Sequence, residues 1–165
     1  MDNMKAAAPA KHVIVVAVDN KPGVVSRISG LFTRRGYNIE SLVTGVTDRS
    51  ELYKLVITVI STEEELELLI CQLGRIMEVI EVYRDTDRPC VTRELMFIRV
   101  NCPAALRSEV IKTADALGLE IAGLGEDTVV VQVIGDDSRL AVAIKAFESY
   151  GIAETIRSGA VTMEL

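Results

Sequence analysis

Several residue types that catalytic and metal sites depend on are scarce in this chain of 165 residues. It contains one histidine, three cysteines and no tryptophan, and aromatic residues make up only 4%. The three cysteines, Cys71, Cys90 and Cys102, have no Cys-x-x-Cys spacing, so with a single histidine they do not form the usual kind of zinc site. No nucleophile stands beside a base. We therefore expect reduced thiols, no catalytic residues and no metal site.

Long apolar runs are also missing. No segment approaches the roughly 18 apolar residues that a membrane helix needs, and the first residues lack the basic and apolar regions of a signal peptide. Acidic residues outnumber basic ones by 24 to 18, for a net charge of −6, which argues against a general affinity for nucleic acid or anionic membranes. We expect a cytoplasmic protein with neither partner, and a flexible leader at residues 1–11.

The chain does have a strong hydrophobic pattern, which is written twice. Hydrophobic residues make up 49% of the sequence, and in each half they predict the order strand, helix, strand, strand, helix, strand. In the first half, strands are expected at 13–18, 39–46, 53–59 and 79–83. Pro22 is expected at the first position of one helix, and Thr62-Glu63-Glu64-Glu65 reads as the capping box of the other.

The second half repeats this order after a linker at Arg88-Pro89-Cys90. Strands are expected at 95–100, 119–124, 128–134 and 152–156. Asn101-Cys102-Pro103 is expected to open one helix and Ser138 to cap the other. The prediction is an α+β protein with two ferredoxin-like βαββαβ units, at residues 12–87 and 92–165. Each unit has a four-stranded antiparallel sheet with two helices on one face.

The third strand predicts association with another chain. Tyr53, Leu55 and Ile57 alternate along one face, but Val56 and Ile60 add apolar area to the other. A sheet that is apolar on both faces favours packing against a second chain or the second unit. On these grounds we predict a homodimer.

The most informative segment joins the first strand to the first helix. It reads Asp19-Asn20-Lys21-Pro22-Gly23-Val24-Val25. A helix start presents unpaired N–H groups and a positive dipole end, so the amides of Gly23, Val24 and Val25 suit a carboxylate. The turn after the helix, at Asn38, is expected to return beside this segment.

The same region has groups suited to an α-amino acid. Asn20 and Asn38 supply carbonyl oxygens that could accept hydrogen bonds from an ammonium group without adding full charge. Val25 and Ile39 would favour an apolar side chain. We therefore expect a binder of a small carboxylate, with an apolar amino acid as the best match.

Comparison of the two halves favours this interpretation. Ala104 aligns with Gly23 and places a Cβ where glycine allows close approach. Glu120 aligns with Asn38 and would repel a carboxylate. We infer that the first half binds the ligand and that the second does not bind the same one. Without this comparison, the favoured interpretation would be that Asn20 caps the helix and that Asn38 is a turn residue.

These residues resemble a known family. The run that starts at Pro22 and ends at Leu42 is similar to the signature of the small, regulatory subunit of acetohydroxyacid synthase (acetolactate synthase), and its most specific part is Arg35-Gly36-Tyr37-Asn38-Ile39-Glu40-Ser41. The similarity covers nearly the whole chain, as an N-terminal ACT domain followed by a second ferredoxin-like domain.

The resemblance implies a non-catalytic subunit with an allosteric effector. Such proteins activate a catalytic large subunit and confer feedback inhibition by a branched-chain amino acid, usually valine. Thiamine diphosphate, magnesium and FAD are expected on that partner and no cofactor on this chain. The effector would lie between the ACT domains of a homodimer, at Asn20, Gly23, Val24, Val25, Asn38 and Ile39.

Some family members have Ser where this chain has Pro22, and Ala where it has Val24. Either difference could alter the affinity for the effector. The alternative interpretation is a tandem ACT sensor of amino acids that regulates another enzyme or a transcriptional response. Acylphosphatases share only the order of elements, which does not determine function. An RNA-binding role would need exposed aromatics on the central strands and a basic surface, whereas Tyr53 is the only aromatic residue of the third strand and the net charge is negative.

Overall fold

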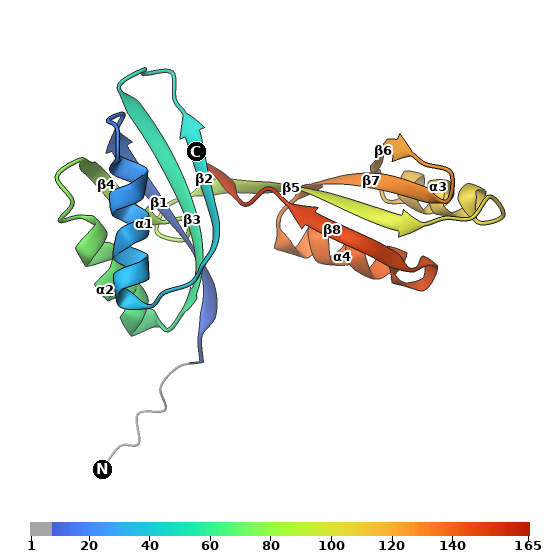
Figure 1. Ribbon diagram of the computed structural model, residues 1–165, viewed down its shortest axis with the longest axis horizontal. Coiled ribbons are helices and arrows are strands. Elements are labelled where there is room, and N and C mark those ends of the chain that lie inside the picture. Colours follow the sequence, from blue (N-terminus) through green and yellow to red (C-terminus); the bar gives the residue numbers. More distant parts are fainter. Residues whose placement is uncertain (1–7) are drawn as a thin grey trace, which may run out of the picture. The chain divides into compact units, whose positions relative to one another are not determined.

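The structure is a computed structural model that describes residues 8–165 and contains two compact units (Figure 1). The first unit comprises residues 8–91 together with Gly159–Leu165, and the second is Thr92–Ser158. The first unit contains β1 (Ala10–Asp19), α1 (Val24–Arg35), β2 (Ile39–Val46), β3 (Leu52–Ser61), α2 (Glu63–Leu73) and β4 (Val79–Arg84).

The second unit repeats the order of the first. Its elements are β5 (Cys90–Asn101, which starts in the first unit), α3 (Arg107–Ala116), β6 (Glu120–Leu124), β7 (Thr128–Gly135), α4 (Asp137–Phe147), a 3₁₀ turn (Glu148–Tyr150) and β8 (Ile152–Arg157). A last strand, β9 (Val161–Glu164), pairs with β5. The antiparallel strand orders are β2-β3-β1-β4 and β6-β7-β5-β8. The predicted fold class, α+β with two ferredoxin-like units, is confirmed.

In the first unit, one face of the sheet packs against both helices. Ile14 pairs with Ile57 and Val16 with Leu55 across β1 and β3, and all four are fully buried. The stripes of α1 and α2 cover them, with Ile28, Phe32, Leu66 and Leu69 among the buried residues. The second unit builds a separate core in the same way, from alternate residues of β5 and β7 and the inner faces of α3 and α4.

The ends of the helices follow from single residues. Gly36 adopts the left-handed φ of +73° that ends α1, and the N–H of Tyr37 donates to the oxygen of Phe32 at 3.0 Å. The expected capping box of Thr62 and Glu65 is confirmed at α2.

Three expected helix starts differ from the structure. Helix α1 begins at Val24, because Pro22 lies in a turn and Gly23 is the N-cap residue. Helix α3 begins only at Arg107, since Pro103 opens a separate turn that closes on Leu106. Asp136, and not Ser138, caps α4: its carboxylate accepts from the N–H of Arg139 at 2.9 Å. That hydrogen bond and one from the Ser138 hydroxyl hold the pKa of Asp136 below its usual range.

The C-terminal segment Gly159–Leu165 lies against the face of the first sheet that carries no helix (Figure 1, in red). Its Ala160 and Thr162 are buried, as are Val15 and Val56 on that face of the sheet. The N–H of Leu165 donates to the oxygen of Pro89 at 2.9 Å. The predicted domain boundaries, 12–87 and 92–165, say which segments fold independently, and they stay a prediction.

This cover changes the argument for a homodimer. Val56 is only 4% exposed within a single chain, whereas Ile60 is 54% exposed. The part of this apolar face at Val56 is thus buried within a single chain, whereas Ile60 stays exposed. The homodimer stays a prediction, and this face alone does not require it.

Gly159 lets the C-terminal segment approach β2 closely. It has a left-handed φ of +86°, and a Cβ there would lie 2.8 Å from Cγ2 of Val43 and 2.9 Å from Cβ of Ser41. Gly118 also has a left-handed φ, +61°, but a Cβ there would meet nothing within 4 Å. Comparing alanine substitutions at the two glycines therefore distinguishes the cost of backbone strain from the cost of steric overlap.

We expect Gly159→Ala to destabilise the first unit more than Gly118→Ala destabilises the second. Both changes force alanine into a left-handed φ, but only the first adds overpacking, which costs about 1–3 kcal/mol. Urea unfolding of both variants measures the difference. Equal losses would show that the segment does not pack tightly on β2.

Tyr83 on β4 lies near the same C-terminal segment, since Glu164 affects its pKa. Burial raises the pKa of its hydroxyl, and the neighbouring Cys90 and Glu164 raise it further. Arg88, whose guanidinium carbon lies 4.2 Å from the ring centroid and which pairs with Glu164 at 3.2 Å, opposes that shift.

We expect the phenol of Tyr83 to ionise above the ordinary pKa of about 10. The unfolded chain then loses this proton first, so the stabilisation is complete below about pH 10 and is lost as the pH rises from there through the folded pKa. The absorbance titration at the phenolate band, taken as wild type minus Tyr83→Phe, isolates this group. A difference transition centred at or below about pH 10 would contradict the burial of Tyr83.

Candidate functional site

A hollow of about 490 Å³ lies at the start of α1. We call it the α1 hollow, and its walls come from the end of β1, the first turn of α1 and the start of β3. The residues that line it are Val18, Asp19, Lys21, Gly23, Val24, Val25, Ser26, Ser29 and Tyr53. Three of the predicted effector residues, Gly23, Val24 and Val25, therefore lie together at one surface.

Backbone donors at this end of α1 are available to an anion. Gly23, with φ +85°, is the N-cap and makes no side-chain cap. The N–H of Val24 points at the oxygen of Lys21 over a long 3.4 Å. Within residues 8–165, the N–H groups of Gly23, Val25 and Ser26 have no acceptor. Two of the three expected donors, Gly23 and Val25, are therefore available, and Ser26 takes the place of Val24.

Charged side chains around the α1 hollow are already paired. Lys21 Nζ lies 2.7 Å from Asp19 Oδ2, and that hydrogen bond raises the pKa of Lys21. Arg27 pairs with Glu78 at 2.5 Å. Binding of a carboxylate here would therefore depend mainly on the backbone N–H groups and the helix dipole.

Asn20 supports the neighbouring hairpin. Its Nδ2 donates to the oxygen of Ser50 at 2.8 Å, and its own N–H donates to the oxygen of Glu51 at 2.8 Å. Both contacts fix the turn between β2 and β3 beside the start of α1. The side-chain oxygen of Asn20 is left as the acceptor that the amino-acid hypothesis requires.

Asn38 and Ile39 lie at the other end of α1. The helix has 12 residues, so at 1.5 Å per residue its two ends are about 18 Å apart. Asn38 is exposed and donates through Nδ2 to Oε1 of Glu40 at 2.9 Å. The expectation that this turn lies beside the helix start is wrong for a single chain. All six residues can share one site only if two chains contribute to it, and that assignment stays a prediction.

The corresponding end of the second unit carries different chemistry. Arg107, the first residue of α3, donates to the oxygen of Gly125 at 2.8 Å and also binds that of Glu126. Glu120, which aligns with Asn38, accepts a hydrogen bond from Gln132 at 3.0 Å. In the second unit, an arginine side chain thus holds the hairpin between β6 and β7, which corresponds to the β2–β3 hairpin that Asn20 holds in the first unit.

Tyr53, Ser26 and Ser29 line the α1 hollow but were not among the predicted site residues. Tyr53 lies opposite Val18 in the pairing of β3 with β1. The register of the two strands, together with the turn at Asp48–Ser50, is the sequence signal that could have placed it there. The two serines follow Val25 on the first turns of α1.

Two further features of the described residues bear on the kind of protein. Between residues 8 and 165, no group of three or more His, Cys, Asp or Glu side chains could hold a metal ion. None of the helices in this part of the chain is long and apolar enough to cross a membrane.

Comparison with known families decides what the chain is related to. Residues 14–81 match the family described as "AHAS small subunit-like ACT domain", and residues 93–165 match "Small subunit of acetolactate synthase". A "Probable acetolactate synthase small subunit" from Archaeoglobus fulgidus is 39% identical over 153 residues, which are 93% of this chain and 96% of that protein. The chain belongs to the acetolactate synthase small-subunit family.

Other members of the acetolactate synthase small-subunit family align over the same length. The "Acetolactate synthase small subunit" of Mycobacterium bovis is 33% identical over 156 residues, covering 94% of this chain and 93% of that one. A crystal structure of the acetolactate synthase small subunit from Thermotoga maritima superposes with a TM-score of 0.78 at 26% identity, over 94% of this chain and 98% of that one. The resemblance inferred from the Pro22–Leu42 signature is confirmed.

Two glycines of the α1 region are expected to respond in opposite directions to alanine. Gly23→Ala forces a side chain into a left-handed φ and should lower the free energy of unfolding by about 1 kcal/mol. Gly30 lies inside α1, where a Cβ meets only Arg34 at 3.8 Å, so Gly30→Ala should raise that free energy by roughly 0.5–1 kcal/mol. Thermal unfolding of both variants measures the pair. Stabilisation by Gly23→Ala would mean that α1 starts earlier than Val24.

Proposed function

We propose that this chain is the regulatory subunit of an acetolactate synthase. It binds the catalytic large subunit, raises its activity and makes that activity subject to feedback inhibition by valine. Membership of the small-subunit family supports this role, since relatives named as small subunits align with this chain over nearly their whole length.

The observation that carries the effector site is the unpaired backbone at the start of α1. The N–H groups of Gly23, Val25 and Ser26 have no acceptor in residues 8–165 and border the α1 hollow. The carboxylate of valine would accept from these donors, and its ammonium group would donate to the side-chain oxygen of Asn20. Val25, 37% exposed, offers an apolar contact to the side chain.

A second chain completes this site in the proposal. Asn38 and Ile39 are about 18 Å from Gly23 along α1, so they would come from the ACT domain of the other chain in a homodimer. A ligand held by two chains biases how the chains pack, which is a two-state element that can transmit a signal. Coupling of ~1–3 kcal/mol to the catalytic partner is enough for effective inhibition.

The catalytic chemistry belongs to the partner. Thiamine diphosphate, magnesium and FAD are assigned to the large subunit. The role of this chain is to bind and to change shape.

The first test is the formation of acetolactate from pyruvate by the catalytic subunit of the same organism. This protein is titrated in with and without valine. Activation that valine reverses is the expected result. Activation without sensitivity to valine would contradict the effector site, and no effect from a folded protein would favour a tandem ACT sensor of another system.

Gly23→Asp should abolish inhibition by valine while activation remains, because a carboxylate beside the helix start repels the carboxylate of the ligand. Aspartate tolerates a left-handed φ better than most residues, so the fold should persist. Gly23→Asn is the matched control, since it has nearly the same size and no charge. Inhibition by valine that persists in Gly23→Asp would contradict the site. Equal loss of inhibition in both variants would indicate that the size of the new side chain, and not its charge, prevents binding.

A further inference from the structure

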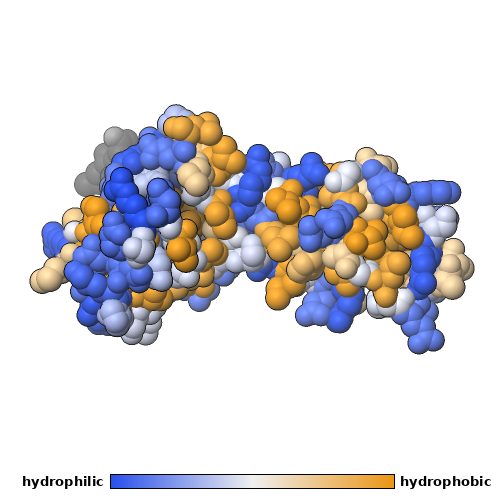
Figure 2. Space-filling model, turned by 90° about the horizontal axis from the view of Figure 1, so that it is seen from above, coloured by the Kyte–Doolittle hydropathy of each residue, from blue (hydrophilic) through white to orange (hydrophobic). Residues whose placement is uncertain are grey.

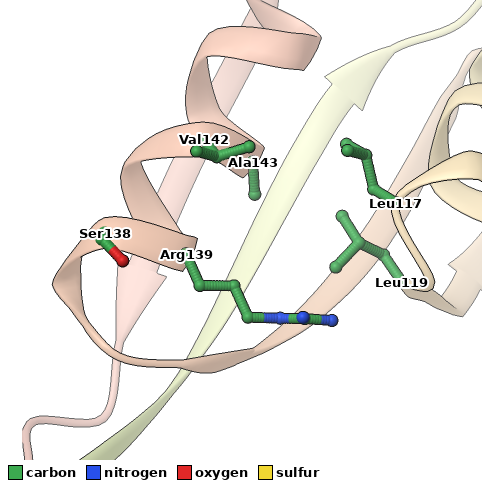
Figure 3. A pocket seen from close by; sticks show the side chains of 6 residues that line it. All are labelled: Leu117, Leu119, Ser138, Arg139, Val142 and Ala143. Carbon is green, nitrogen blue, oxygen red and sulfur yellow. The ribbon is translucent and has the colours of Figure 1, made fainter.

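A second hollow, of about 200 Å³, lies in the second unit between the end of α3 and the first turns of α4. We call it the α4 hollow. Leu117 and Leu119 form one wall, and Val142 and Ala143 on α4 form the other (Figure 3). The side chain of Arg139 extends from α4 toward Leu119, and Ser138 also lines the hollow.

The internal repeat shows how this hollow arises. The helix caps Thr62 and Asp136 align α2 with α4, so buried Leu69 corresponds to buried Ala143. The helix-ending glycines Gly36 and Gly118 align the two turns, so Tyr37 corresponds to Leu119. In the first unit, Tyr37 and Leu69 both pack in the core cluster. Smaller side chains, Leu119 and Ala143, stand at both positions in the second unit, and both line the α4 hollow.

The polar side of the α4 hollow also differs from the matching region of the first unit. Glu65 of the first unit folds back on its own helix cap and accepts from the N–H of Thr62 at 2.8 Å. Arg139 stands at the matching place and extends away from its helix (Figure 3). The rim therefore carries a cation where the first unit has a committed carboxylate.

Gly135 holds Arg139 in that position. A Cβ on Gly135 would lie 2.7 Å from Cβ and Cδ of Arg139, so the arginine stem packs directly over the glycine. The matching residue in the first unit is Ser61. Three aligned differences, at Gly135, Arg139 and Ala143, thus act together to open a space and to place a guanidinium across it.

The guanidinium has donors to spare. A guanidinium carries five N–H donors, and in the described part of the chain that of Arg139 has one hydrogen bond, a long one of 3.4 Å to the oxygen of Gly118. Asp136, three residues earlier in the chain, is committed to the N–H of Arg139 and the hydroxyl of Ser138. An anion at the hollow would therefore find an open cationic partner.

We propose that the α4 hollow binds a short aliphatic carboxylate of about four to six carbons. Its carboxylate would accept two parallel hydrogen bonds from Arg139, and its alkyl group would fill the space between Leu119, Val142 and Ala143. The volume lies below the roughly 300–1,000 Å³ of pockets for drug-sized ligands, which limits the ligand to a few non-hydrogen atoms. This site is independent of the α1 hollow and of its proposed effector.

The test is a titration of the full chain with 3-methylbutanoate, followed by methyl and amide NMR. Saturable shifts are expected at Leu117, Leu119 and Val142. Arg139→Gln should weaken binding about 10- to 100-fold, as for loss of a charged hydrogen-bond partner. Ala143→Leu restores the residue found in the first unit and should abolish binding by filling the space.

Lys145→Gln is the matched control, because it removes a positive charge from an exposed position of the same helix and should leave binding unchanged. The uncharged 3-methylbutanamide should not bind. Absence of saturable shifts, equal affinity in Arg139→Gln, or shifts confined to the α1 hollow would each overturn the proposal. So would tighter binding of valine than of 3-methylbutanoate at this hollow.

Discussion

The register between β1 and β3 is the constraint on which the first unit depends. Ile14 and Val16 face the helices through their pairing with Ile57 and Leu55, and all four are excluded from water. A slip of one residue would turn every one of these side chains to the opposite face. The register also brings Tyr53 opposite Val18, and in doing so it builds the wall of the α1 hollow against which the helix start is presented.

The opposite face of that sheet depends on the end of the chain. The second unit, Thr92–Ser158, lies in sequence between the first sheet and the segment that covers it. Gly159 approaches Ser41 and Val43 so closely that a side chain would overlap them, and Arg88 links β4 to Glu164 while its guanidinium lies over Tyr83. Burial of Val15 and Val56 thus couples the order of the last residues to the stability of the first unit.

The two units show how one scaffold supports different surfaces. The cores keep the same positions at Leu66 and Leu140, and the turns keep Gly36 and Gly118. The polar and surface residues differ: Gly23 is a left-handed cap with unpaired donors beside it, whereas Arg107 at the matching end is committed to the hairpin. Conversely, Leu119 and Ala143 of the second unit, which are smaller than Tyr37 and Leu69 at the matching positions, line a hollow. Both units match models of the acetolactate synthase small-subunit family.

The sequence by itself determined the repeated order of elements, the faces of the strands, the C-terminal end of α1, the start of α2 and the family. The signals for these features are all local: the periodicity, Gly36, the Thr62–Glu65 capping box and the Pro22–Leu42 signature. It did not determine where α1, α3 and α4 begin, since Pro22, Pro103 and Ser138 each fit either a helix start or a turn. Hydrogen bonds of the folded chain decide between the two, such as the one from the N–H of Arg139 to Asp136. Only the tertiary structure decided that Asn38 lies a helix length from Gly23, that Gly159–Leu165 covers the first sheet, and that small residues leave a hollow beside Arg139. These features depend on contacts between residues far apart in the chain, which no local pattern specifies.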